Sequence, residues 1–182
     1  MRRIDWSALD DAGRREALTR PASRAEQTVV DVVRDVFEQV ALSGGEAVRR
    51  LSLKFDGYAP RRVAITAEAV AAARDALPPT ATHSLRIAAE NVRVFHEATR
   101  PEDTPFLETT PGVRSRLVWR PISAAGIYVP GGTAPLFSSL LMQAIPAAVA
   151  GVRERVVVTP PARDGGVHPA MIYAAAEAGL DA

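Results

Sequence analysis

Few residues in this chain of 182 have the types and spacing that chemistry requires: three histidines, a serine pair and one glycine-rich loop. The histidines are His83, His96 and His168, and none has a second histidine or a cysteine at the spacing of a metal motif. Ser138 and Ser139 lack the flanking glycines of a nucleophile elbow and have no histidine close by in the sequence. These patterns predict neither a metal centre nor a serine nucleophile.

The glycine-rich loop is Gly131-Gly132-Thr133, which precedes a predicted helix. Free amides and the helix dipole at such a position favour anions. The loop matches neither G-x-G-x-x-G nor G-x-x-x-x-G-K-[ST], so it is interpretable as a ligand contact or as a tight structural turn. Tyr128 also has two interpretations, a buried core tyrosine or a platform on which a flat ligand stacks. The pattern alone leaves both pairs of alternatives open.

The elements that position this loop are two apolar segments with a helix between them. Residues 125–129 and 155–159 are rich in β-branched types and predict buried strands. Residues 136–149 are apolar on nearly all sides and predict a covered helix, which Gly151 is expected to end. Strand, crossover helix and strand form a parallel unit, and ligands of such units collect beyond the carboxyl ends of the strands. Pro130, which cannot continue a central strand, lies at that end.

The part of the chain before this unit is predicted to be mostly helical. A capping box at residues 23–26 starts one helix, which Gly44-Gly45 ends, and further helices are expected over residues 46–55, 67–77, 81–99 and, after the central unit, 167–178. Residues 101–111 read as a polar connection, and residues 112–120 alternate as a half-exposed strand does. We therefore expect a helical N-terminal region, residues 1–110, and the start of an α/β region, residues 111–182.

Composition narrows the class of protein. Hydrophobic residues make up 47% and charged residues 24% of the chain, which is typical of a globular protein, and the net charge of +1 favours no nucleic-acid partner. Cysteine is absent, which excludes disulfides and thiolate ligands within these residues. The N-terminal segment carries acidic residues and lacks an apolar core, so neither a signal peptide nor a membrane association is expected, and the predicted location is cytoplasmic.

Several segments in order resemble the histidinol dehydrogenase family. The long block GIYVPGGTAPLFSSLLMQAIPAAVAGVRERVVVTPP, residues 126–161, resembles the corresponding block of that family. Residues 53–57, LKFDG, resemble its K-F-D-G segment, and residues 91–98, NVRVFHEA, resemble its N-I-x-x-F-H segment. Arg120-Pro121 resembles the R-P that precedes the family's glycine loop. The matches span most of the chain.

The resemblance implies a zinc- and NAD-dependent oxidoreductase. The family oxidises L-histidinol to L-histidine in two steps through the aldehyde, within histidine biosynthesis, and works as a homodimer. It implies an incomplete Rossmann-like parallel sheet related to that of aldehyde dehydrogenases, beside a helical N-terminal layer. It also implies that Tyr128, the tyrosine of the Y-[VI]-P-G-G motif, contacts NAD, and that Pro130, Gly131 and Gly132 shape the same cofactor-binding pocket.

The resemblance also implies that the catalytic groups of the family are absent from these residues. Family chains are much longer, and their zinc ligands and their acid/base pair lie downstream of the matched segments. No residue here is assigned a catalytic or metal-binding role, and we expect the chain to be a truncated N-terminal portion that is inactive alone. The alternative is a non-catalytic module that binds dinucleotide or pairs with a full-length subunit. An aldehyde-oxidising relative is disfavoured because cysteine is absent.

Overall fold

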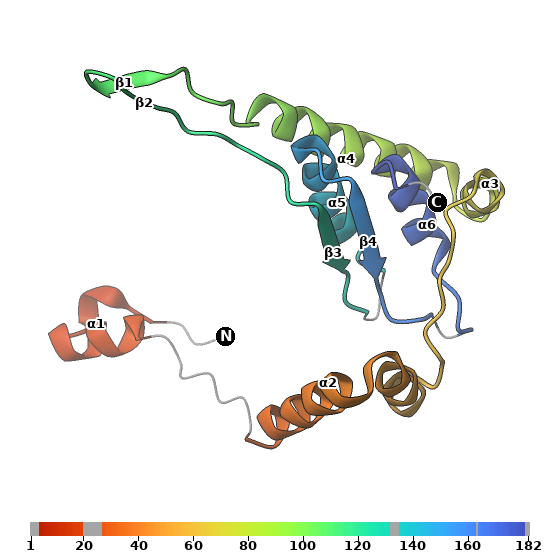
Figure 1. Ribbon diagram of the computed structural model, residues 1–182. Coiled ribbons are helices and arrows are strands. Elements are labelled where there is room, and N and C mark those ends of the chain that lie inside the picture. The colour runs from red at the N-terminus through yellow and green to blue at the C-terminus, as the bar shows by residue number, and fades with distance from the viewer. Residues whose placement is uncertain (1–3, 20–26, 132–134, 163, 181–182) are drawn as a thin grey trace. The chain divides into compact units, whose positions relative to one another are not determined.

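The computed structural model of the protein describes residues 4–19, 27–131, 135–162 and 164–180 (Figure 1). The chain divides into two compact units, Met1–Leu51 and Ser52–Ala182. The division of the sequence at residues 110 and 111, which was drawn from the expected secondary structure, stays a prediction. Among the described residues, no helix is both long and apolar enough to cross a membrane.

The first unit is helical. Helix α1, Asp11–Leu18, is capped by the Asp10 carboxylate, which accepts a hydrogen bond of 2.7 Å from the Gly13 amide. Helix α2, Gln27–Asp56, has a non-helical residue at Gly44, where φ is +52°, so the break expected at the glycine pair is confirmed. The predicted capping box at residues 23–26 lies outside the described residues. Many apolar side chains of α2 are exposed, Phe37 to 72%, whereas Ala47 and Leu51 are buried.

Two more helices precede the sheet of the second unit. Helix α3, Ala67–Asp75, begins where the Thr66 hydroxyl accepts a hydrogen bond of 3.2 Å from the Ala69 amide. Helix α4, Pro79–Ala98, begins with a proline at its first position, where a missing amide costs no hydrogen bond. Both helices lie close to their predicted positions. Helix α4 packs against α5 and α6, and α3 packs against α6.

The predicted parallel unit is confirmed. Strand β3, Ala124–Tyr128, pairs in parallel with β4, Glu154–Val158, and helix α5, Phe137–Ala150, connects them (Figure 1). Gly151 caps α5 in the left-handed region at φ +88°, as expected for a helix-ending glycine. The register places Tyr128 opposite Val158, so both strands end at the same edge.

Helices cover one face of this sheet. Ile127 and Val129 are buried on that face among side chains of α5 and of α6, Pro169–Glu177. The largest fully buried side chains are Leu140, Leu141, Ile145 and Val129. On the opposite face Tyr128, Val156 and Val158 are all more than half exposed. The strands therefore have a core face and an open face, and the prediction that both are buried is wrong for the open face, which no helix of the described residues covers.

A hairpin replaces the single strand expected over residues 112–120. Strand β1, Leu107–Thr110, pairs antiparallel with β2, Val113–Ser115, and both strands are exposed on each face. The prediction of a polar connection over residues 101–111 missed β1, because its β-prone threonines adjoin charged residues and a Pro-Gly turn. Gly112 forms that turn at φ +82°.

Candidate functional site

The candidate site lies at the end of the sheet where β3 and β4 finish. We call this the carboxyl edge and define it by Tyr128 with residues 129–131 and 159–162. The Val129 amide donates a hydrogen bond of 2.9 Å to the Val158 carbonyl, which extends the pairing one residue beyond β3. Val129 is fully buried, whereas Pro130 and Gly131 are exposed. The chain therefore leaves the core at Pro130, as the proline predicts.

The Tyr128 ring faces outward. Its side chain belongs to the open face of the sheet, and the residue is 59% exposed. Of the two interpretations that the sequence left open, the buried core tyrosine is wrong, because the inner face of β3 is occupied by Ile127 and Val129. An exposed ring at the end of a parallel strand is suited to stacking on a flat ligand. That Tyr128 contacts a cofactor stays a prediction.

Gln143 anchors this end of β3 to helix α5. Its Nε2 donates to the Tyr128 carbonyl at 3.2 Å and to the Ser139 carbonyl at 3.0 Å. No role for Gln143 is predicted from the sequence, although a lone amide within an apolar helix is a signal for such a contact. The contact joins residues 15 apart and satisfies a strand carbonyl that β4 does not bond on that side.

The glycine at position 131 is explained by close packing. A Cβ atom built on Gly131 falls 3.2 Å from Cγ and 3.3 Å from Cβ of Pro160. These separations are shorter than ordinary van der Waals contact. The loop after β3 thus lies directly against the residues after β4, and a side chain at position 131 pushes the two loops apart. Gly132, the fourth predicted site residue, lies outside the described residues.

Helix α5 begins close in sequence to this edge. Its N-cap residue is Leu136, which provides no side-chain hydrogen bond to the first turn. Ser138 and Ser139 lie in that first turn, as expected, and Ser139 donates its amide to the Leu136 carbonyl at 3.0 Å. A helix start without a capping side chain leaves amide hydrogens available to an anionic group.

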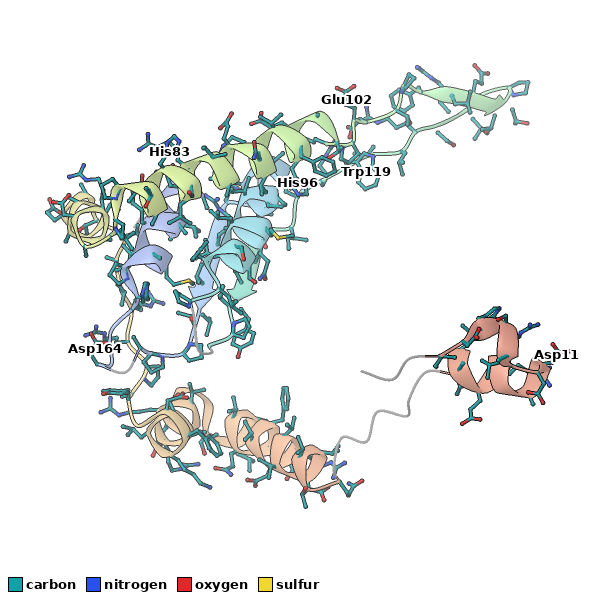
Figure 2. The ribbon with its side chains drawn as sticks, turned by 180° about the vertical axis from the view of Figure 1, so that it is seen from behind. Asp11, His83, His96, Glu102, Trp119 and Asp164 are labelled. Atoms are coloured by element: carbon teal, nitrogen blue, oxygen red, sulfur yellow. The ribbon has the colours of Figure 1, made fainter. Side chains whose placement is uncertain are left out.

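The three histidines lie on helix α4 and at the start of α6, where His168 and His96 make local contacts. His168 is the N-cap of α6, and its Nδ1 accepts a hydrogen bond of 3.1 Å from the Ala170 amide. His96 packs edge-on to Phe95 with ring centroids 5.3 Å apart, and His83 is exposed on the same helix, α4 (Figure 2). Within the described ranges, no three side chains of histidine, cysteine, aspartate or glutamate come together as metal ligands do.

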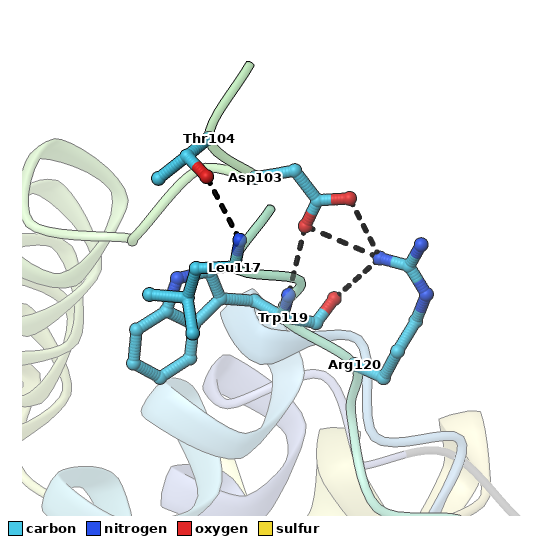
Figure 3. Close-up of polar contacts among 5 residues, drawn as sticks. All are labelled: Asp103, Thr104, Leu117, Trp119 and Arg120. Atoms are coloured by element: carbon cyan, nitrogen blue, oxygen red, sulfur yellow. Dashed lines mark hydrogen bonds and ion pairs between the residues drawn. The ribbon is translucent and has the colours of Figure 1, made fainter. Parts of the chain in front are cut away.

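A hollow elsewhere in the second unit contains none of these residues. This hollow of about 550 Å³ is lined by the end of α4 and by residues around Asp103 and Trp119, at the end of the sheet where β3 begins. The Asp103 carboxylate there accepts hydrogen bonds from the Trp119 amide at 2.8 Å and from Arg120 at 3.0 Å (Figure 3). The Trp119 amide and then Arg120 hold the pKa of Asp103 below its ordinary value. This cluster ties the base of the hairpin and contains no residue of the carboxyl edge.

Comparisons with known proteins place this chain in one family. A family model described as histidinol dehydrogenase matches residues 18–182. Histidinol dehydrogenase of Xylella fastidiosa (strain Temecula1 / ATCC 700964) is 41% identical over 180 residues, which cover 99% of this chain and 42% of the relative. That of Escherichia coli (strain K12) is 39% identical over 160 residues, which cover 87% of this chain and 36% of the relative.

A solved structure shares the fold as well. The crystal structure of histidinol dehydrogenase from Elizabethkingia anophelis is similar with a TM-score of 0.82 and 31% sequence identity. The similarity covers 95% of this chain and 40% of that chain. This chain therefore spans about two fifths of the length of the relatives it matches.

Proposed function

The chain belongs to the histidinol dehydrogenase family, and from that premise we propose that its residues form the N-terminal portion of an NAD- and zinc-dependent oxidoreductase. The reaction is the oxidation of L-histidinol to L-histidine in two steps through the aldehyde, in histidine biosynthesis, by a homodimer. The observation that carries the proposal is the family match over residues 18–182. The role of these residues is to build the first parallel unit and the edge that receives NAD.

The carboxyl edge suits part of a dinucleotide. The exposed Tyr128 ring offers a flat apolar surface to a base or a nicotinamide ring. The start of α5, which lacks a capping side chain, offers amide hydrogens to a phosphate group. Because Gly131 carries no side chain, the backbone of the loop after β3 can lie close to Pro160 in the loop after β4. NAD, when bound, supplies the hydride acceptor, while Tyr128, Pro130, Gly131 and Gly132 bind and orient it.

Zinc does not fit the residues described. Its sites in enzymes require three protein ligands, and the described part of the chain presents no such group. We therefore derive no catalytic step through zinc and assign no zinc ligand to this chain. Oxidation of histidinol needs a group that removes the alcohol proton, and the contacts of His168 and His96 are with the Ala170 amide and the Phe95 ring, not with the carboxyl edge.

A second function follows from the same observations. If these residues act without the catalytic apparatus of the family, the chain is a non-catalytic module that binds dinucleotide or pairs with a full-length subunit. Mixing this chain with a full-length relative distinguishes the two. A complex that survives gel filtration supports the module, and its absence favours the N-terminal portion of a larger enzyme.

A calorimetric titration of the chain with NAD tests whether the carboxyl edge binds the dinucleotide. Replacing Tyr128 with Ala removes a stacking surface worth about 1–3 kcal/mol, so we expect affinity to fall by about 5- to 150-fold. The variant Tyr128→Phe keeps the ring and is the matched control, with affinity close to that of the wild type. Equal NAD affinity of the wild type, Tyr128→Ala and Tyr128→Phe removes Tyr128 from the site. If the wild type gives no heat of binding at millimolar NAD, the carboxyl edge is not a dinucleotide site.

A further inference from the structure

Tyr58 lies directly against the turn that follows β4. A Cβ atom built on Gly165 falls 2.5 Å from Cε1 and 2.6 Å from Cδ1 of the Tyr58 ring. Separations of this size mean that the ring touches the backbone of Gly165 and occupies the space of any side chain there. Gly165 also has φ +76°, which favours glycine for a second, independent reason. Tyr58 is 39% exposed, so part of its surface is covered.

The turn that Tyr58 contacts is tightly bonded within itself. The Gly165 amide donates to the Ala162 carbonyl at 2.8 Å, and the Ala162 amide donates to the Gly166 carbonyl at 2.8 Å. The Asp164 carboxylate accepts a further hydrogen bond of 2.8 Å from the Gly166 amide (Figure 2 labels Asp164). Because these bonds make the turn one unit, a ring that contacts Gly165 restrains Ala162 as well.

The turn adjoins the carboxyl edge. Pro160, two residues before Ala162, packs closely against Gly131, where a Cβ atom would lie 3.2 Å from its Cγ. Gly131 in turn follows Tyr128 and Val129, whose pairing with Val158 ends the sheet. A continuous series of contacts therefore runs from the Tyr58 ring through the turn to the loop after β3.

We propose that Tyr58 is a positioning residue for the carboxyl edge: its ring holds the turn after β4, which sets Pro160 against Gly131 in the loop that receives the dinucleotide. The ligand in this statement rests on the proposed function. The segment at residues 53–57 thereby gains a role, because it ends α2 and delivers Tyr58 to the turn. A loop held in place before binding loses less conformational entropy when the ligand arrives, so affinity depends on the ring.

The first experiment is amide hydrogen exchange on the 182-residue chain without any ligand. In Tyr58→Ala we expect the hydrogen-bonded amides of Ala162 and Gly165 to exchange at least about tenfold faster, while the amides of β3 keep their protection. Tyr58→Phe keeps the ring and should restore slow exchange. Phe106→Ala, which removes a half-exposed ring on the hairpin, is the matched control. Unchanged exchange at the turn in Tyr58→Ala overturns the proposal.

A double-mutant cycle tests the contact itself. Gly165→Ala should lower the Tm in the wild-type background, because the new methyl group meets the ring and because φ is positive. In the Tyr58→Ala background the second cost remains and the first is gone, so the decrease in Tm should be clearly smaller. Additive decreases mean that the ring does not press on the turn, and they overturn the proposal.

An NAD titration of the same variants connects the contact to the ligand. We expect Tyr58→Ala to bind NAD about three- to tenfold more weakly and Tyr58→Phe to bind as the wild type does, by the preorganisation argument. Equal affinity of Tyr58→Ala and wild type overturns the positioning role even if exchange is faster. If the wild type binds no NAD, the proposed function fails, and the exchange measurement still decides whether Tyr58 holds the edge.

Discussion

Arg155 of β4 is bonded to Gly179 beyond the end of α6: its Nη2 donates to the Gly179 carbonyl at 2.6 Å. Its Nη1 donates to the Ala178 carbonyl at 3.2 Å. Arg93 of α4 donates to the carbonyl of the preceding residue, Glu177, at 3.0 Å. Two guanidinium groups from different elements thus satisfy the last carbonyls of one helix, where the helix dipole also favours positive charge. These bonds fix α6 against both the sheet and α4.

Replacing Arg155 with Met should destabilise the second unit. The variant keeps an apolar stem but leaves two carbonyls at the end of α6 without their donor, at a cost of about 1–3 kcal/mol. Because Arg155 is only partly buried, we expect the lower half of that range. Urea unfolding followed by circular dichroism measures the change. Arg153→Met, two residues earlier and exposed, is the control, and an equal loss in both variants would contradict the capping role.

Replacing Gly131 with Ala should strain the carboxyl edge. The new methyl group meets the Pro160 ring at 3.2 Å, so one loop must move, and we expect a loss of about 1–2 kcal/mol in the free energy of unfolding. Gly126→Ala, within β3, is the matched control, because nothing lies within 4 Å of a Cβ atom there. If Gly131→Ala unfolds no more easily than Gly126→Ala, the close packing against Pro160 carries no energetic weight.

Helix α5 should be the most sensitive element to truncation of its side chains. Leu140 is 1% exposed, and replacing it with Ala removes buried methyl groups and leaves a cavity, at a cost of about 2–5 kcal/mol. Met142 is 66% exposed on the same helix, so Met142→Ala should change stability by less than about 1 kcal/mol. Denaturant unfolding of both variants checks the difference. Similar losses would mean that α5 does not face the core as described.

The base of the hairpin should loosen in acid. The pKa of Asp103 is lowered from 3.8 in the folded chain, chiefly by the Trp119 amide and then by Arg120. A carboxyl with a lowered pKa adds stability at every pH above its unfolded value and loses that stability as the pH falls through the folded value. The contribution is therefore full well above pH 3.8 and is lost progressively as the pH falls below 3.8 and through the lower pKa of the folded chain.

Nuclear magnetic resonance measures this directly through the chemical shift of the Trp119 amide during an acid titration. We expect the shift to change with a midpoint below 3.8 in the wild type. Asp103→Asn removes the titrating group, so the transition should vanish while the fold remains. A midpoint at or above 3.8 would mean that the carboxylate gains nothing from its partners in the hairpin base.

Local patterns in the sequence predicted the parallel unit with its glycine-capped helix. The short run over residues 125–129, rich in β-branched types, the apolar stretch over residues 136–149 and the helix-ending Gly151 are all local features, so they can be recognised without a structure. The resemblance of residues 126–161 to one family is equally local. The same reasoning placed Tyr128 at the end of the strand where ligands collect.

Tertiary structure decided which way Tyr128 faces and what holds its loop in place. A strand has two faces, and the sequence does not say which face the helices cover. The outward orientation of the Tyr128 ring therefore follows only from the packing of α5 and α6 on the inner face. The contacts of Gly131 with Pro160, Tyr58 with Gly165 and Arg155 with Gly179 join residues distant along the chain. Such pairs leave no periodic signal in a single sequence, because only the folded chain brings them together.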